Sequence, residues 1–217
     1  MTRLSAPSAS AKRLGLTLAC VGLALYGARF LWISTRTNIP VNLPILMAVG
    51  DMRTPEFKVN RNAPYDIYIE VQKKIPFDTL NCLLGTAAGP TSSDLQECPD
   101  RPSVVKVSWV LTSDGQLVAR GSTDEHRSGA WTNDSIERDL GHFQSRSGRP
   151  YILNVDVLAD GSLLAPGNPR LKVEVLPTVC EDELFESAIV NLIAVGLVIV
   201  GGILLLVPFA RIEQLGA

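Results

Sequence analysis

Two long apolar stretches frame the chain, and a segment of alternating polarity lies between them. The second stretch, residues 187–210, holds 24 residues without a charged side chain, and Asn191 near its start is its one amide. At about 1.5 Å of rise per residue it forms roughly 36 Å of helix, enough to cross a hydrocarbon core of about 30 Å. A buried helix of a soluble protein would carry a polar stripe. We therefore predict a transmembrane helix over residues 184–210.

The first apolar stretch, residues 14–33, is interrupted only by Arg29. A cleaved signal peptide is the alternative, because a basic start precedes the apolar core. Cleavage after Ala28 would place Tyr26 where a small residue is required, and the apolar run resumes after the interruption at Arg29. We therefore favour an uncleaved transmembrane helix over 14–35. Arg29 lies near the far end of this helix, where its side chain can extend to the headgroups. An intramembrane ion pair is the other interpretation.

The orientation follows from the basic residues that flank the two helices. Arg3, Lys12 and Arg13 precede the first helix and Arg211 follows the second, whereas an acidic cluster at 181–186 lies between them. By the positive-inside rule, both tails, 1–13 and 211–217, are cytoplasmic. The central domain, 36–183, is then periplasmic or extracellular, and the protein is a two-pass protein of the cytoplasmic (inner) membrane.

The central domain has the period-two pattern of β-strands with one buried face. Clear strands are expected at 65–71, 105–111, 117–118, 151–157 and 171–175, weaker ones at 41–49, 56–59 and 136–143, and one short helical turn at 77–84. Asp114-Gly115 between two apolar alternations predicts a hairpin turn. We therefore predict an all-β domain, an antiparallel β-sandwich of the Greek-key or jelly-roll kind, flanked by the two transmembrane helices.

Small residues in both helices allow the helices to pack closely as an antiparallel pair. These residues are Gly15, Ala19, Gly22 and Gly27 in the first helix and Gly196, Gly201 and Gly202 in the second. The pairing is an expectation rather than a requirement, because glycine is common in membrane helices.

The four cysteines point to an oxidising compartment. Cys82 and Cys98 lie 16 positions apart in a loop rich in Gly, Pro and Ser, a spacing that suits a disulfide. Free thiols are the alternative, and a zinc site lacks the further Cys or His ligands it needs. Cys20 lies inside the first helix as a small apolar residue. Cys180 is left as a free thiol or as half of an intermolecular bridge, so homo-oligomers could form through it or through the helices.

No motif in the sequence indicates catalysis, a cofactor or a metal. The two histidines, His126 and His142, are expected in a solvated loop and at a strand surface, and no nucleophile elbow or phosphate-binding loop is present. Asp66 and Glu70 share a strand face but lie about 13 Å apart along it. Residues 37–183 carry 14 basic and 20 acidic residues, a balance of −6 that argues against nucleic acid as a ligand.

The aromatic residues supply the best contact candidates. Trp109 falls on an apolar alternation and is expected in the core, whereas Trp131 lies in a polar loop and is a candidate ligand or partner contact. Its alternative is packing over one end of the sandwich. Tyr68 and His126 are weaker contact candidates, and Arg29 and Asn191 are the polar residues within the membrane.

We therefore expect a non-enzymatic, membrane-anchored interaction module, an accessory or scaffolding subunit of a membrane complex. Its partners would be the lipid bilayer and a protein in the membrane or the periplasm. One alternative is an immunity-type protein that neutralises a periplasmic toxin through its acidic surface. Another is a membrane-tethered glycan-binding module, which requires an exposed Trp131.

Overall fold

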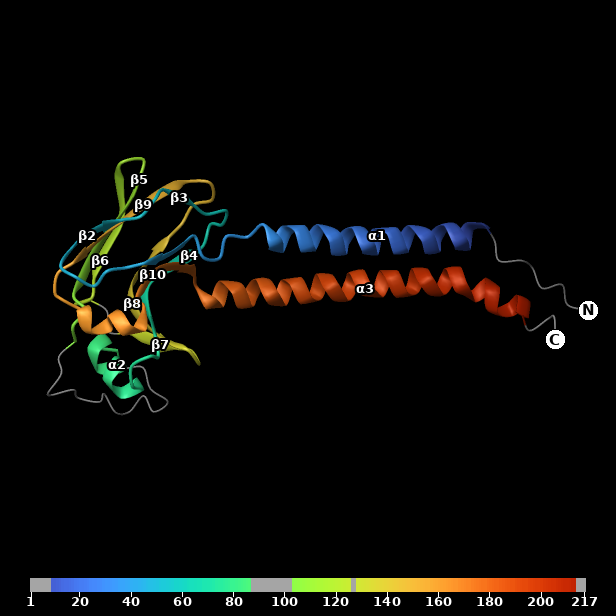
Figure 1. Ribbon diagram of the computed structural model, residues 1–217. Coiled ribbons are helices and arrows are strands. Elements are labelled where there is room, and N and C mark those ends of the chain that lie inside the picture. The colour runs from blue at the N-terminus through green and yellow to red at the C-terminus, as the bar shows by residue number, and fades with distance from the viewer. Residues whose placement is uncertain (1–8, 87–102, 126–127, 214–217) are drawn as a thin grey trace, which may run out of the picture. The chain divides into compact units, whose positions relative to one another are not determined.

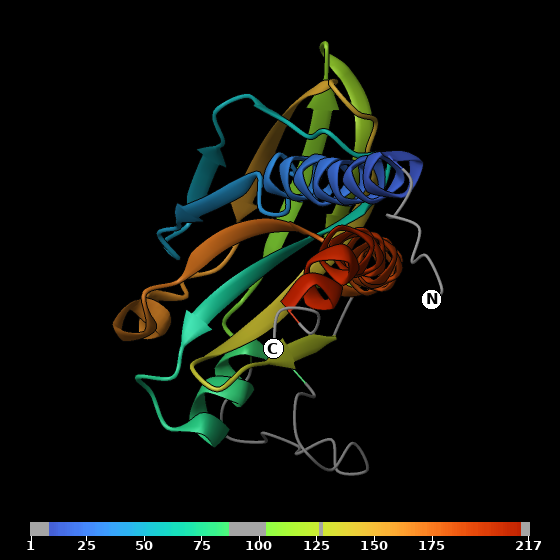
Figure 2. The ribbon, with the colours of Figure 1, turned by 90° about the vertical axis from the view of Figure 1, so that its right-hand side faces the viewer.

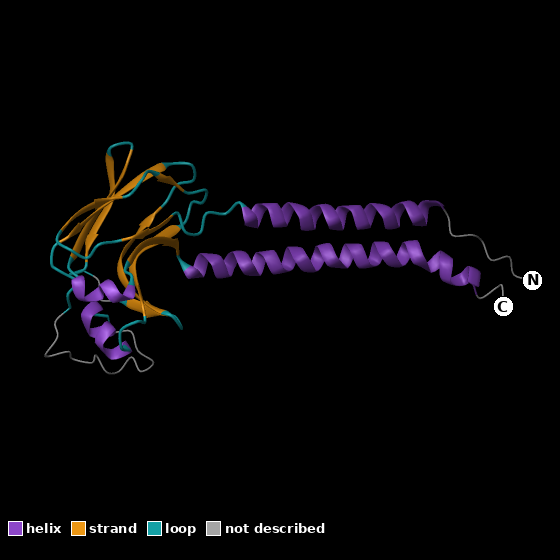
Figure 3. Ribbon diagram, viewed as in Figure 1, coloured by secondary structure: helices purple, strands orange, loops and turns teal. Residues whose placement is uncertain are grey.

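A computed structural model describes residues 9–86, 103–125 and 128–213, and the chain divides into two compact units. The helical unit comprises Met1–Arg36 and Cys180–Ala217, and the strand unit comprises Thr37–Val179. Figure 1 shows the course of the chain, and Figure 3 shows that strands dominate the second unit.

The helical unit is an antiparallel pair formed by α1 (Ala9–Ser34) and α3 (Pro177–Glu213), which lie side by side in two views (Figures 1 and 2). A Cβ added at Gly22 would lie 2.6 Å from the carbonyl oxygen of Ala194, and one added at Gly201 would lie 2.6 Å from the carbonyl oxygen of Gly15. Backbones approach this closely only where a side chain is missing. The predicted helix pair is confirmed.

Only some of the predicted small residues form this contact. A Cβ at Gly201 would also meet Ala19, whereas Gly27, Gly196 and Gly202 have open space at the position of a Cβ. The contact therefore follows one face of each helix. Glycine content alone could not select that face.

The strand unit consists of two antiparallel sheets. The first has the order β1–β10–β4–β8–β7, and the second has the order β2–β9–β5–β6, with β3 paired to β9. The strands are β1 (Val41–Pro44), β2 (Gly50–Arg53), β3 (Phe57–Lys58), β4 (Pro64–Gln72), β5 (Val107–Ser113), β6 (Gln116–Ser122), β7 (Gly129–Trp131), β8 (Ser135–Gln144), β9 (Pro150–Val157) and β10 (Arg170–Val175). The described part of the unit also contains two short helices, α2 (Phe77–Leu84) and η1 (Ser162–Gly167).

Most of these elements lie where the alternation of the sequence predicts them. The strong patterns correspond to β4, β5, β6, β9 and β10, and the short helical turn corresponds to α2. Of the weaker patterns, β1 and β3 are shorter than expected. The sequence missed β2, β7 and η1. Both strands are short and mostly exposed, so they lack a buried alternation that would mark them.

The hairpin turn between β5 and β6 forms as predicted. Asp114 has φ 51° and Gly115 has φ 75°. Two successive residues with positive φ are typical of the type I′ turn, whose twist matches that of the flanking strands.

The core contains alternate side chains from both sheets. Trp109 of β5 is 2% exposed, and its Nε1 donates a hydrogen bond of 2.7 Å to the carbonyl oxygen of Leu140 on β8. This bond joins a strand of the second sheet to a strand of the first. The prediction that Trp109 lies in the core is confirmed.

The predicted disulfide between Cys82 and Cys98 stays a prediction. Cys82 lies on α2, but Cys98 is outside the described residues. Cys20 and Cys180 form no disulfide within this chain, and an intermolecular bridge through Cys180 stays a prediction.

We predict that Gly22→Val weakens the helix pair by about 1–3 kcal/mol, because the new side chain would overlap the backbone of α3. Gly196→Val is the matched control. Its Cβ has open space, so we expect a change within about 0.5 kcal/mol. The measurement is unfolding of the full chain in mixed micelles with increasing dodecyl sulfate. Equal effects of the two variants would contradict this packing.

Candidate functional site

The outer face of the first sheet gathers acidic side chains from three neighbouring strands. Asp66 and Glu70 point outward from β4, and the register places Glu174 of β10 opposite Asp66 and Glu137 of β8 opposite Glu70. Residues that are directly opposite in an antiparallel pair have Cβ atoms about 4.5–5.5 Å apart. Carboxylates that are distant in sequence therefore become neighbours.

A β-bulge in β8 adds a further carboxylate to this face. Ile67 pairs with Gly141 and Tyr68 pairs with Asp139, so Leu140 is the extra residue on β8. Gly141 has φ 131°, a backbone conformation that side chains rarely adopt. The bulge allows Leu140 to stay buried while Asp139 lies beside Tyr68 on the outer face.

These side chains line a cleft with a volume of about 370 Å³, which we call the carboxylate pocket. Four acidic residues line the pocket, and its described lining contains no Lys, Arg or His. The lining consists of Asp66, Tyr68, Ser128, Gly129, Ala130, Glu137, Asp139, Glu174, Val175 and Pro177.

Hydrogen bonds hold two of the four carboxylates in place. The hydroxyl of Tyr68 donates to Glu174. Asp139 accepts one bond of 2.7 Å from Ser128 Oγ and another of 2.8 Å from the backbone N–H of Gly141. Beside the pocket, Lys172 Nζ lies 2.9 Å from Glu70 Oε1. That lysine therefore pairs with a carboxylate outside the pocket.

Burial and like charges change how the pocket binds protons. Burial, together with the nearby Asp139 and Glu174, raises the pKa of Asp66 to about 6, although His142 opposes the shift. Burial and then the charge of Glu70 raise the pKa of Glu137. Burial and the hydrogen bond to Glu174 raise the pKa of the Tyr68 hydroxyl. Both carboxyls therefore hold a proton more tightly than an exposed carboxyl does.

The arrangement favours positive over negative charge in the pocket, because four carboxylates face one cleft. Within the described ranges, no three His, Cys, Asp or Glu side chains come together as metal ligands.

The structure separates the residues that the sequence singled out. Tyr68 is 7% exposed and lines the carboxylate pocket, although it was a candidate for an exposed contact. Trp131 lies on the edge strand β7 and is 48% exposed. Lys73 Nζ lies 5.3 Å from the centre of the Trp131 ring and 5.3 Å from that of the Phe77 ring. His142 is exposed on β8, and His126 is outside the described residues.

The two polar residues of the predicted membrane segments lie on facing helices. Arg29 Nε on α1 donates a hydrogen bond to Ser187 Oγ on α3. Asn191 lies on α3, one turn further along, and its Oδ1 is buried without a hydrogen bond among the described residues. In this structure Arg29 thus bonds to a hydroxyl of the same chain.

Sequence reasoning missed the carboxylate pocket because its members come from separate strands. The alternation shows an outward polar position on each strand, and it places Asp66 and Glu70 on the same face of one strand, but it does not show which acidic residues of other strands lie beside them. The pairing of β4 with β10 and β8 brings the four acidic residues together. No local pattern encodes that pairing.

No known family and no curated protein matches the sequence. A solved structure with some similarity is a crystal structure of a protein from Sulfurospirillum deleyianum. It has a TM-score of 0.45 and 13% sequence identity, and the match covers 64% of this chain and 98% of that chain. At this TM-score and identity, the similarity defines neither a shared fold nor a shared function.

We predict that Asp66→Asn stabilises the protein by about 1 kcal/mol at pH 7.5, after the pKa shift is discounted for the half-exposed side chain. The pKa of Asp66 is higher in the folded chain than its usual 3.8, so the folded state binds more protons between pH 4 and 6. Stability from this group is therefore present at low pH and is lost as the pH rises through 6. Urea unfolding of the full chain in detergent, from pH 4 to 7.5, measures the difference.

The increase in the free energy of unfolding caused by Asp66→Asn should grow as the pH rises and reach a plateau above pH 7. Asp124→Asn, in an exposed turn, is the control and should change stability by less than about 0.5 kcal/mol. A gain that does not depend on pH would exclude the charge of Asp66 as its cause.

Proposed function

We propose that this chain is a two-pass membrane-anchored interaction module, an accessory or scaffolding subunit without catalytic activity of its own. Its strand unit is held outside the cytoplasm, and its tails are cytoplasmic. The observation that carries the proposal is the exposure of apolar side chains along the two long helices.

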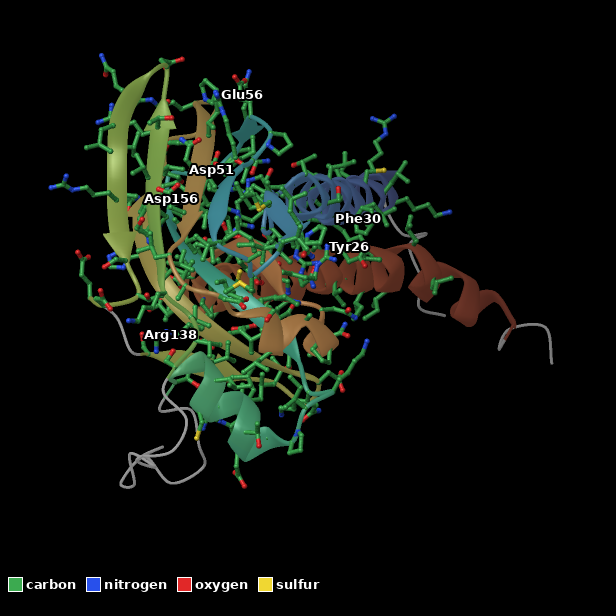
Figure 4. All side chains as sticks on the ribbon, turned by 60° about the vertical axis from the view of Figure 1, so that its left-hand side comes forward. Tyr26, Phe30, Asp51, Glu56, Arg138 and Asp156 are labelled. Carbon is green, nitrogen blue, oxygen red and sulfur yellow. The ribbon has the colours of Figure 1, made fainter. Side chains whose placement is uncertain are left out.

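Apolar side chains cover the outside of both helices. Leu23 and Phe30 of α1 are 62% and 63% exposed, and Leu192 of α3 is 76% exposed. Phe30 and Tyr26 are labelled on α1 in Figure 4. The core helix of a soluble protein would bury such residues, and continuous exposed apolar surface requires another apolar phase. Ser10–Ser34 and Pro177–Leu206 are both long and apolar enough to cross a membrane.

The contacts of α1 support its retention in the mature protein. Gly15 and Gly22 pack on the backbone of α3, and Arg29 donates to Ser187. A cleaved signal peptide has no need of such a partner helix. At the end of α1 that precedes the strand unit, the guanidinium of Arg36 lies 4.0 Å from the Trp32 ring centre and 4.0 Å from Glu183. Aromatic and charged residues of this kind favour the headgroup region.

The proposed architecture of the strand unit is a β-sandwich. Two antiparallel sheets contribute buried side chains, and the bond from Trp109 to Leu140 links them. Such a domain has its own core and leaves its outer faces free for contacts.

We predict that affinity purification of the full chain from native membranes in mild detergent recovers at least one protein partner in stoichiometric amount. Mass spectrometry identifies it, and an unrelated two-pass protein purified in parallel is the control. The immunity-type alternative predicts a single secreted toxin as that partner. Recovery of the protein without any partner would contradict the proposed interaction module.

The topology has its own test. Green fluorescent protein fused after Ala217 should fluoresce, because it folds in the cytoplasm, and alkaline phosphatase at the same position should be inactive. The opposite pair of results would reverse the proposed orientation.

Glycan binding is a second candidate function, because about half of Trp131 is exposed to solvent beside Lys73. An exposed indole is a common stacking surface for ring-shaped ligands. On a glycan panel, Trp131→Ala should abolish binding, whereas Leu117→Ala, an exposed residue on β6, should not. Equal binding by wild type and Trp131→Ala would exclude this surface.

A further inference from the structure

The loop between β1 and β2, residues 45–49, presents an aliphatic side chain to solvent from a fixed backbone. Leu46 is 86% exposed, while its neighbours Ile45 and Met47 are 3% and 4% exposed. A leucine between two buried anchors is held outward by the fold.

Backbone hydrogen bonds hold this loop on both sides. The N–H of Ile45 donates to the carbonyl of Pro169 at 3.1 Å, and the N–H of Gly161 donates to the carbonyl of Met47 at 2.6 Å. Two further exposed leucines, Leu158 and Leu163, lie on the segment that holds the loop. A rigid surface loses little conformational entropy on binding, which favours affinity.

The loop separates two clefts, and Leu46 lines both. One cleft has a volume of about 500 Å³ and includes Ala165, Pro169 and Arg170 in its wall. The other has a volume of about 390 Å³ and includes Val49 and Asp51. Both volumes fall within the range of about 300–1,000 Å³ that is usual for ligand sites.

The charges of the two clefts differ in sign. Arg170 is the only charged residue that lines the first cleft, and no carboxylate forms a salt bridge with it in the described part of the chain. Its Nε and Nη2 donate to Asn42, at 2.5 and 2.8 Å, which fixes the guanidinium at the rim. Arg170 makes this cleft suited to a carboxylate although the domain as a whole is negatively charged, whereas Asp51 makes the second cleft unsuited to one.

Within the strand unit, the loop lies at one end of the β1–β10 ladder. Pro44 pairs with Arg170 at one end of the β1–β10 ladder, and Val41 pairs with Val173 towards the other. Thr37 and Val179, where the strand unit joins the helices, lie in sequence beyond that other end. The loop therefore lies at the end of this ladder opposite the one from which the chain continues to both junctions.

We infer that the 45–49 loop is the docking surface for a segment of a different protein, which carries an aliphatic side chain on Leu46 and a carboxylate on Arg170. The inference rests on the proposed interaction function and names the surface and the chemistry of its partner.

The test is photo-crosslinking of the full chain in native membranes, with benzoylphenylalanine introduced at position 46. The matched control is position 117, where Leu117 is also an exposed leucine, at 59%, but lies on β6. We expect a crosslinked protein from position 46 and none from position 117. The crosslinked peptide of that partner, identified by mass spectrometry, should contain an acidic residue close to an aliphatic one.

Charge variants test the second half of the inference. Arg170→Glu should lower the crosslinking yield at position 46 at least tenfold, whereas Arg170→Lys and Asp51→Lys should keep most of it. Because Arg170 also bonds to β1, thermal unfolding of each variant checks that the fold is intact. Leu46→Ala removes only an exposed side chain. Even with Arg170 intact, it should reduce co-purification of the same partner about tenfold.

Several results would overturn the docking surface. These are a crosslink at position 46 to lipid or to a second copy of this chain, equal crosslinking at position 117, or no effect of Arg170→Glu and Leu46→Ala. If affinity purification recovers a partner whose yield these variants leave unchanged, the docking surface is wrong and the interaction module stands. If no partner is recovered at all, both fail.

Discussion

Strand β4 is hydrogen-bonded along both edges, to β10 and to β8, and the register of these two ladders governs the strand unit. Because strand side chains alternate, the same register buries Ile67 and Ile69 and turns Asp66 and Glu70 outward. A slip of one residue would move the isoleucines into solvent and the carboxylates into the core. The apolar face of β4 therefore determines which acidic residues meet on the opposite face.

The carboxylate pocket is a direct consequence of that register. The raised pKa of Asp66 reflects first its burial and then the repulsion from the nearby Asp139 and Glu174, because like charges that face each other destabilise a sheet. Tyr68 and Lys172 offset part of it, through a hydrogen bond to Glu174 and an ion pair with Glu70. Groups with strongly shifted pKa values concentrate where a surface has a role besides folding.

The helical unit is stabilised by a different physical effect. Between two helices in lipid, burial of apolar surface provides little driving force, because the acyl chains are as apolar as leucine. Close contact between backbones at Gly15, Gly22 and Gly201 replaces it, through van der Waals attraction. Under the proposed membrane anchoring, the strand unit depends on water and the helical unit depends on a bilayer, so the two units would respond to different solvents.

The sequence by itself determined the elements whose pattern is local. The uncharged run at 187–210, the alternation of Tyr65 to Val71, the Asp114-Gly115 turn and the buried Trp109 were all readable, because periodicity and turn chemistry act over a few residues. The tertiary structure alone decided which strands are neighbours, and hence that Asp66 meets Glu174 and that Leu46 is held in solvent between two buried residues. Strand pairing is set by the packing of the whole core, and a single chain segment does not contain that information.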